Sequence, residues 1–97
     1  MKIYNVEAKV WKYQGSGPWH FVYVSDKDSA SIKKLTDGKK KVGFGFIPVE
    51  VKVGKTVWRT TLFPTKEGPY LLCIKTSVRK SEGIFEGDSV IAKVKII

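Results

Sequence analysis

Period-two alternation of apolar and polar side chains is the feature that most constrains the fold of this chain. It runs over residues 3–12 and again over residues 90–96. Successive side chains of an extended chain point to opposite faces, so this period is typical of half-buried β-strands. In the first segment the expected core face carries Tyr4, Val6, Ala8 and Val10, and the opposite face carries Asn5, Glu7, Lys9 and Trp11.

Four further segments are predicted to be strands. Residues 19–25 are aromatic and β-branched, and residues 70–76 contain an apolar run. Residues 49–53 and 56–63 flank Gly54-Lys55, a pair typical of a hairpin turn.

A glycine-rich segment over residues 42–47 precedes Pro48. Two glycines at alternate positions, Gly43 and Gly45, predict a bend or a close backbone approach in an extended segment. Pro48 suits a strand edge or a break in a strand, because proline has no N–H to donate.

Two segments are predicted to be helical. The first begins at Ser25-Asp26, which are residue types that cap helix N-termini, and stops at Asp37-Gly38. The second is a single turn over residues 78–82, with Ser77 as its cap and Gly83 as its stop.

The order strand, helix, turn, strand occurs twice, over residues 20–53 and residues 70–96. The residue identities barely match, so the repeat is one of pattern. Frequent turns and the absence of βαβ spacing favour a mainly β fold. We therefore expect a small double-split pseudo-barrel of five to seven strands, with two interlocking halves, capped by one α-helix and one short helical turn.

Length and charge limit the classes of protein that remain. The chain has 97 residues, of which 42% are hydrophobic, enough for one core and one domain over residues 1–97. The net charge is +9, from 18 basic and 9 acidic residues. Such a charge attracts polyanions, but 16 of the 18 cations are lysine, spread along the chain, which equally fits a solubilising surface.

No segment of the sequence suggests a membrane partner. The longest uncharged run, Val42–Val49, is far too short to cross a bilayer. The first ten residues carry charges throughout and lack the apolar core of a signal peptide. A cytoplasmic location is the resulting expectation.

The residues that carry most enzyme chemistry are scarce. His20 is the only histidine and Cys73 the only cysteine, so no disulfide and no multi-histidine metal site is expected. Cys73 lies in an apolar run, as a small buried side chain would. No nucleophile elbow and no phosphate-binding glycine loop occurs. We therefore expect no catalytic residues, no metal and no cofactor.

Cations close to aromatic residues are the remaining candidates for a site. The predicted ligand-binding set is Trp58, Arg59, Tyr70, Lys75, Arg79 and Lys80. An alternative nucleic-acid-binding set is Lys33, Lys34, Lys39, Lys40, Lys41, Arg79 and Lys80. Such groups hold phosphates and stack on bases. Equally, Trp58 could pack in the core and the lysines could be solvated.

The second half of the chain resembles the prokaryotic domain-of-unknown-function family nineteen-oh-five. The residues that carry the resemblance are Val57–Pro64, Tyr70, Lys75, Val78–Lys80, Gly83-Ile84 and Gly87–Val90. The resemblance implies a double-split β-barrel capped by helices, and no established activity, cofactor or catalytic residue. Ser81-Glu82 and Phe85 depart from the residue types expected in that family.

Residues 78–90 are also similar to the half-barrel signature of AbrB-like transcription factors and antitoxins, in which two chains form one swapped barrel that binds DNA. Here one chain would supply both halves, which predicts a monomer. Fold analogy of this kind transfers function poorly. The sequence thus predicts a non-enzymatic binding or interaction module whose partner is unassigned, with an anionic ligand or nucleic acid as the candidates. The alternative function is AbrB-like nucleic-acid binding through a lysine-rich surface.

Overall fold

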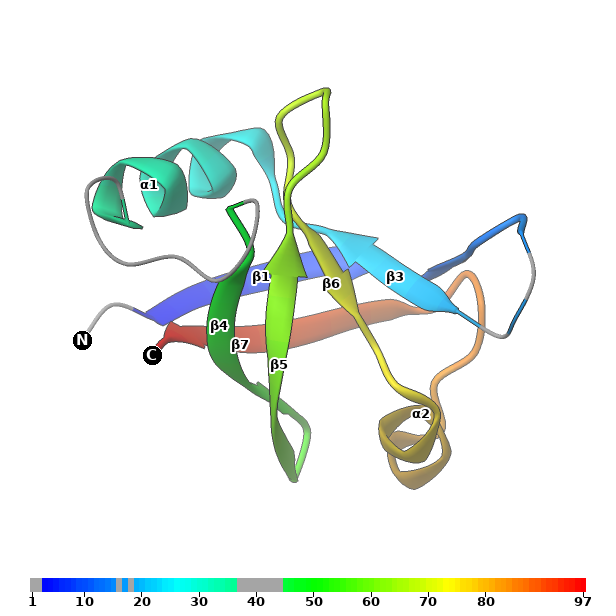
Figure 1. Ribbon diagram of the computed structural model, residues 1–97. Helices are drawn as coiled ribbons and strands as arrows, with labels where there is room; N and C mark the ends of the chain where they lie inside the picture. Colours follow the sequence, from blue (N-terminus) through cyan, green and yellow to red (C-terminus); the bar gives the residue numbers. More distant parts are fainter. Residues whose placement is uncertain (1–2, 16, 18, 37–44) are drawn as a thin grey trace.

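The computed structural model describes residues 3–15, 17, 19–36 and 45–97, and Figure 1 shows their arrangement. In chain order the elements are β1 (Ile3–Lys9), β2 (Trp11–Lys12), β3 (His20–Tyr23), α1 (Asp26–Thr36), β4 (Ile47–Val53), β5 (Thr56–Phe63), β6 (Leu71–Cys73), α2 (Thr76–Glu82) and β7 (Ser89–Ile96). The fold is mainly β, as predicted. Within these ranges, neither helix has the length and apolar character needed to cross a membrane.

The seven strands form one antiparallel sheet in the order β1-β7-β4-β5-β6-β3-β2, which curls into a nearly closed barrel (Figure 1). β1 and β2 are consecutive parts of one bent segment: β1 pairs with β7, and β2 pairs with β3. The bend lies at Val10, whose N–H donates to the carbonyl of Asp88 at 2.9 Å. The Val10 carbonyl accepts from the N–H of Gly87 at 2.8 Å. This segment therefore brings the two ends of the sheet together.

The strand pairings divide the barrel into two equivalent halves. One half runs through β1–β2, β3, α1 and β4, and the other through β5, β6, α2 and β7. β3 pairs with its counterpart β6, and β4 pairs with its counterpart β7. The opening strand of each half crosses into the other half, because β1 pairs with β7 and β5 pairs with β4. The two interlocking halves expected from the repeated pattern are present.

Inward-facing aliphatic side chains fill the barrel. In β4, Val49 and Val51 are fully buried, whereas Glu50 between them is on the opposite face and half-buried. Burying one such side chain stabilises the fold by roughly 1.5–3 kcal/mol. Other fully buried side chains include Val22, Val24, Ile32, Leu62, Leu72, Ile74 and Val94. The first strand follows the predicted alternation, with Tyr4, Val6 and Val10 buried.

Pro48 lies inside β4, opposite Thr61 of β5. β4 is an interior strand, but its pairing with β7 begins only at Val49, so the missing N–H of Pro48 interrupts no bond to β7. The Pro48 carbonyl accepts from the N–H of Ile97 at 3.3 Å. The preceding residues 42–44 of the predicted glycine-rich strand lie outside the described residues.

Helix α1 begins where its capping residues predicted. The N–H of Asp28 donates to Ser25 Oγ at 3.1 Å. Asp26 and Asp28 lie in the first turn and Lys33 and Lys34 in the last, which suits the helix dipole. The predicted stop at residues 37–38 lies outside the described part of the chain.

Helix α2 differs at its start. The prediction that Ser77 caps it was wrong, because the helix begins at Thr76 with Lys75 at the N-cap and no side-chain cap. Lys75 is the last residue with extended backbone angles, so Ser77 already lies inside the helix. The stop was predicted correctly: Gly83 has φ 65°, a left-handed conformation that favours glycine.

Candidate ligand-binding site

The outer face of β2 and β3 carries a set of alternating aromatic side chains. These side chains belong to Trp11, Tyr13, Trp19, Phe21 and Tyr23. The strand register places Trp11 opposite Phe21, and the N–H of Tyr13 donates to the carbonyl of Trp19 at 2.9 Å. Val22 points into the core, so its neighbours along β3 point outward. We call this set the aromatic hairpin.

Ring contacts hold the aromatic hairpin together. Trp11 stacks on Tyr23 with ring centroids 5.3 Å apart, and it tilts against Phe21 at the same distance. Trp19 lies nearly parallel to Phe21, with an interplanar angle of 11°. Tyr13 meets Phe21 edge-on. Such pairs contribute about 0.5–1.5 kcal/mol each beyond their buried area, so the surface has a defined shape.

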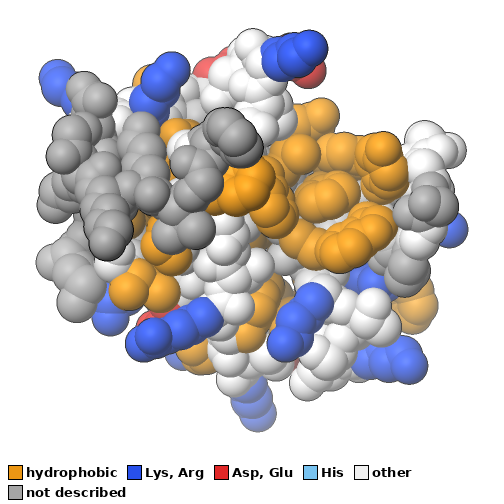
Figure 2. Space-filling model, in the orientation of Figure 1, with side chains coloured by type: hydrophobic (Ala, Val, Ile, Leu, Met, Phe, Trp, Pro, Cys, Tyr) orange, Lys and Arg blue, Asp and Glu red, His pale blue; other side chains and the backbone are white. Residues whose placement is uncertain are grey.

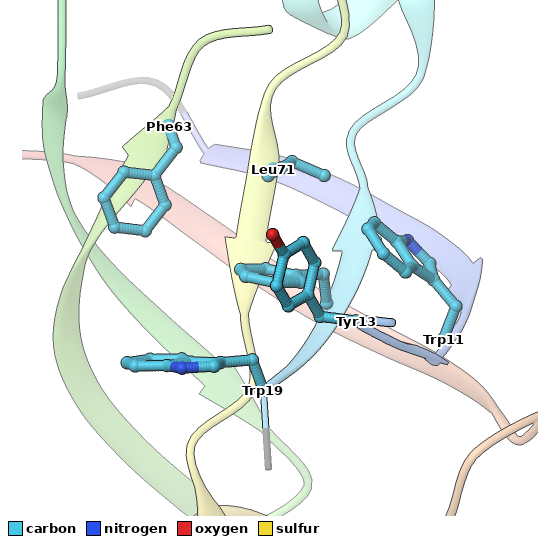
Figure 3. A pocket seen from close by; sticks show the side chains of 6 residues that line it. Trp11, Tyr13, Trp19, Phe63 and Leu71 are labelled. Carbon is cyan, nitrogen blue, oxygen red and sulfur yellow. The ribbon is translucent and has the colours of Figure 1, made fainter. Parts of the chain in front are cut away.

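A groove of about 360 Å³ opens between the aromatic hairpin and the neighbouring strands. Its lining consists of Trp11, Tyr13, Trp19, Phe21, Phe63 and Leu71. Figure 3 shows Phe63 on one side of the hollow and Tyr13 and Trp11 on the other, with Trp19 closing one end. In Figure 2, apolar side chains gather around a hollow on this face of the molecule. We call this hollow the aromatic groove.

The aromatic groove is open to solvent despite its apolar lining. Trp19 is 53% exposed and Tyr13 is 49% exposed. The described lining residues contribute no carboxylate, imidazole, ammonium or guanidinium group. An exposed apolar surface of this kind marks an interaction site more often than a solvated face.

Two glycines of the loop between β2 and β3 let the rings lie against the backbone. A Cβ atom at Gly15 would overlap the ring of Tyr13. Gly17 has φ +92°, and a Cβ atom there would lie 3.0 Å from Nε1 of Trp19. The positions of both exposed rings therefore depend on the absence of a side chain beneath them.

A second, smaller hollow of about 150 Å³ adjoins the aromatic groove. It is lined by Trp19, Cys73, Ile74, Lys75, Thr76 and Arg79. Trp19 lines both hollows, and Cys73 is the register partner of Phe21 in the neighbouring strand. The two hollows are therefore side by side. We call the second one the cationic hollow, because two of its six described lining residues are basic and none of the six is acidic.

Arg79 is held in a fixed position beside the cationic hollow. Its Nε donates to the carbonyl of Ile74 at 3.0 Å, and its Nη2 donates to Thr76 Oγ1 at 2.9 Å. Burial raises the pKa of the Cys73 thiol above its ordinary value, and the positive charge of Arg79 partly opposes this rise. Arg79 and Cys73 both line the hollow, so the positive charge lies near the thiol.

The predicted ligand-binding residues fall in three different environments. Trp58 and Tyr70 lie in the core, only 8% and 5% exposed. Arg59 is on the outer face of β5, where its Nε lies 3.8 Å from Oε1 of Glu50. Lys75 and Arg79 line the cationic hollow. Lys80 is exposed on α2 and is not part of its lining.

The predicted nucleic-acid-binding residues divide between the two helices. Lys33 and Lys34 lie in the last turn of α1, and Arg79 and Lys80 lie in the last turn of α2. These helices are at opposite ends of the barrel (Figure 1). Residues 39–41 lie outside the described residues. The described members of this set therefore do not form one continuous surface.

Groups that could hold a metal or carry acid–base chemistry are dispersed. Among the residues that the structure describes, no three His, Cys, Asp or Glu side chains lie together. His20 is half-buried on β3, and its carbonyl accepts from the N–H of Ile74 at 2.9 Å.

The prediction from sequence did not include the aromatic groove. Its signal was nevertheless present: Trp11 and Tyr13 are two apart, as are Trp19, Phe21 and Tyr23. Once Val10 and Val22 are assigned to the core, this spacing places all five rings on the outer face. Phe63 and Leu71 join them only through the pairing of β5 with β6 and of β6 with β3.

Comparison with known proteins places the chain in a family. A search of curated proteins found no match. A family model with the description "Domain of unknown function (DUF1905)" matches residues 7–94. The match includes both barrel halves, the aromatic hairpin and the cationic hollow, and it confirms the resemblance seen in the sequence. The chain therefore belongs to this family of domains of unknown function.

Proposed function

We propose that this protein is a non-enzymatic binding module whose ligand is a small molecule with a flat, largely apolar ring system. The ring lies in the aromatic groove, against Trp19 and Phe21 and facing Phe63. The single observation that carries this proposal is a solvent-open groove whose lining, among the described residues, consists of five aromatic side chains and one leucine.

Size and chemistry of the groove support a small ligand. Its volume of about 360 Å³ lies within the range of roughly 300–1,000 Å³ that is usual for small-molecule sites. Aromatic walls favour flat rings, because stacked and edge-to-face contacts add to the gain from burying apolar surface. None of the lining residues that the structure describes carries a carboxylate or an imidazole group, which supports binding rather than catalysis at this place.

Fluorescence titration with a neutral flat probe, naphthamide, tests the proposal. We expect a saturable change in tryptophan emission, because Trp11 and Trp19 line the groove. Trp19→Ala should weaken binding about tenfold, as expected for the loss of one stacking partner worth about 1–3 kcal/mol. Ile91→Ala is the matched control, since Ile91 is also exposed and apolar but lies on β7.

The proposal fails if folded protein shows no saturable response to the probe. It also fails if Trp19→Ala binds as tightly as the unchanged protein. Trp19 is about half exposed, so its truncation is expected to leave the fold intact, which circular dichroism can verify.

Single-stranded nucleic acid is the second candidate ligand. The observation that favours it is the exposure of Trp19 and Tyr13 on a protein with a net charge of +9. Bases stack on aromatic side chains with little regard to sequence, while cations hold the phosphates. The lysine-rich surface predicted for AbrB-like binding would meet duplex DNA instead.

A titration with duplex and single-stranded oligonucleotides separates these possibilities. Nucleic-acid binding predicts affinity that falls steeply as salt increases, because counterions are released on binding. Loss of single-strand binding in Trp19→Ala would locate the strand in the aromatic groove. Duplex binding that is lost in a Lys33→Gln, Lys34→Gln variant would support the AbrB-like alternative, and no binding at low salt would exclude both.

Other expectations from the sequence stay predictions. They concern a single domain over residues 1–97, a cytoplasmic location, the absence of catalytic activity and a monomeric state. Sedimentation at micromolar concentration tests the last of these, and an obligate dimer would contradict it.

A further inference from the structure

We infer that the aromatic groove and the cationic hollow form one composite site for an aromatic anion, with the ring in the groove and the acidic group of the ligand in the hollow. This inference rests on the proposed function and names the class of ligand. It identifies Lys75 and Arg79 as the residues that distinguish an anion from a neutral ring.

The aromatic groove and the cationic hollow lie next to each other. Trp19 forms part of both linings. Phe21 in the groove and Cys73 in the hollow are paired across β3 and β6. Side chains paired in this way have Cβ atoms about 4.5–5.5 Å apart. A substituent on a ring that stacks in the groove can therefore reach the cationic hollow without a long linker.

The cationic hollow has the charge and the size that suit the acidic group of a ligand. Its lining, as far as the described residues show it, holds one guanidinium and one ammonium group and no carboxylate. The volume of about 150 Å³ is several times the roughly 30 Å³ that one water occupies, so a carboxylate or phosphate group fits. Much of the wall is apolar, from Trp19, Ile74 and Cys73, and charges interact more strongly beside such a wall than in open water.

The side chain of Arg79 is already oriented before a ligand binds. The hydrogen bonds to the carbonyl of Ile74 and to Thr76 Oγ1 hold the guanidinium plane at the junction of β6 and α2. Less side-chain freedom is then lost when an anion binds. Its effect on the Cys73 thiol, described above, supports the same placement of positive charge.

The test compares three probes that share one ring system: the naphthoate anion, its neutral amide and naphthyl phosphate. In low salt we expect naphthoate to bind about tenfold more tightly than the amide, and this preference to shrink as salt rises. Naphthyl phosphate should show a preference at least as large if the natural anion is a phosphate. A preference only for naphthoate would assign a carboxylate.

Variants show whether the hollow causes the preference. Lys75→Gln and Arg79→Gln should each reduce naphthoate affinity several-fold and leave amide affinity unchanged. Lys80→Gln is the matched control, because Lys80 lies on the same helix but outside the lining. Arg79→Gln removes the bonds to Ile74 and Thr76 and could unfold α2. The described residues show no hydrogen bond of the Lys75 side chain, so Lys75→Gln should leave the fold intact and remains informative in that case.

Failure of this inference can be told apart from failure of the proposed function. Equal binding of naphthoate and amide, or a preference that survives both hollow variants, overturns the composite site and leaves the ring-binding groove in place. Absence of binding by all three probes overturns the proposed function itself.

Discussion

Ser29 in α1 accepts a hydrogen bond from the backbone N–H of Tyr70 at 3.0 Å, and this bond ties the helix to the start of β6. The same hydroxyl donates to the carbonyl of Val24 at 3.2 Å. Among the described residues, Ser29 is the one buried polar side chain. It therefore joins the ends of β3 and β6, the two strands that meet near the aromatic groove.

Replacement of Ser29 by alanine should destabilise the fold. The Tyr70 N–H would lose its acceptor in a buried place, which costs about 1–3 kcal/mol. Urea unfolding followed by circular dichroism measures the change. Ser89→Ala, at an exposed position of β7, is the control and should change stability by less than about 0.5 kcal/mol. Equal stability of both variants would contradict a structural role for the Ser29 hydroxyl.

Glu82 should couple energetically to Thr56. Thr56 Oγ1 donates to Glu82 Oε2 at 2.6 Å, and the N–H of Lys55 donates to the same oxygen at 3.3 Å. These bonds dock α2 on the turn between β4 and β5. A double-mutant cycle with Glu82→Ala and Thr56→Val should give a coupling of about 0.5–1.5 kcal/mol in the free energy of unfolding. Additive effects of the two changes would show that the contact is not stabilising.

Stability should fall as pH rises above about 9. Burial raises the pKa of Cys73 from its ordinary value of 9.0, with Arg79 in partial opposition. The unfolded chain therefore loses this proton before the folded protein does, so ionisation favours unfolding in this range. Burial also raises the pKa of Tyr70 above 10.0, which extends the loss to higher pH.

Urea midpoints at pH 8 and pH 10 test this pH dependence, and Cys73→Ala serves as the comparison. Cys73→Ala should lose less stability between pH 8 and pH 10 than the unchanged protein. The variant has no thiol at position 73 to ionise, so of these two groups only Tyr70 still lowers its stability. A fall as large as that of the unchanged protein would mean that Cys73 is not responsible. Alkylation of Cys73 in the folded protein should also be slow at neutral pH, since the thiolate is the reactive form.

A methyl group at position 15 should disturb the aromatic groove without unfolding the barrel. The Cβ atom of Gly15→Ala would overlap the distal part of the Tyr13 ring, which can swing away because Tyr13 is half exposed. We expect a changed near-ultraviolet circular dichroism spectrum, weaker naphthamide binding and a nearly unchanged melting temperature. Gly68→Ala is a poor control, because Gly68 has φ +112° and its backbone would be strained. Ile91→Ala serves as the control instead. If Gly15→Ala and Ile91→Ala had the same effect on the spectrum and on naphthamide binding, the role of Gly15 would be contradicted.

Most of the fold could be predicted from local patterns. Alternation assigned the strands, and Ser25 and Gly83 marked one end of each helix. The start of α2 was missed because a serine at position 77 satisfies the capping preference, whereas the backbone turns two residues earlier, at Lys75. The repeated order of elements indicated two halves, but the exchange of opening strands between them depends on long-range pairing.

Much less of the candidate site could be predicted. Trp58 and Tyr70 looked available beside cations, but the barrel buries them, because β5 and the start of β6 turn these side chains inward. Lys75 and Arg79 were selected by charge alone, and their neighbour Trp19 is distant in sequence. A groove built from three strands needs the register between them, and no local pattern contains that register.

The interlocking of the two halves has a consequence for synthesis of the chain. Ile3 of β1 lies opposite Lys95 of β7, so the first strand of the barrel to be synthesised pairs with the last. At 5–20 residues per second, β1 waits on the order of ten seconds for its partner. During this time its edge is open to other strands, and the charges of Glu7 and Lys9 discourage such contacts. Barrel closure therefore waits for the synthesis of β7, and we expect nascent chains that end before β7 to depend on chaperones.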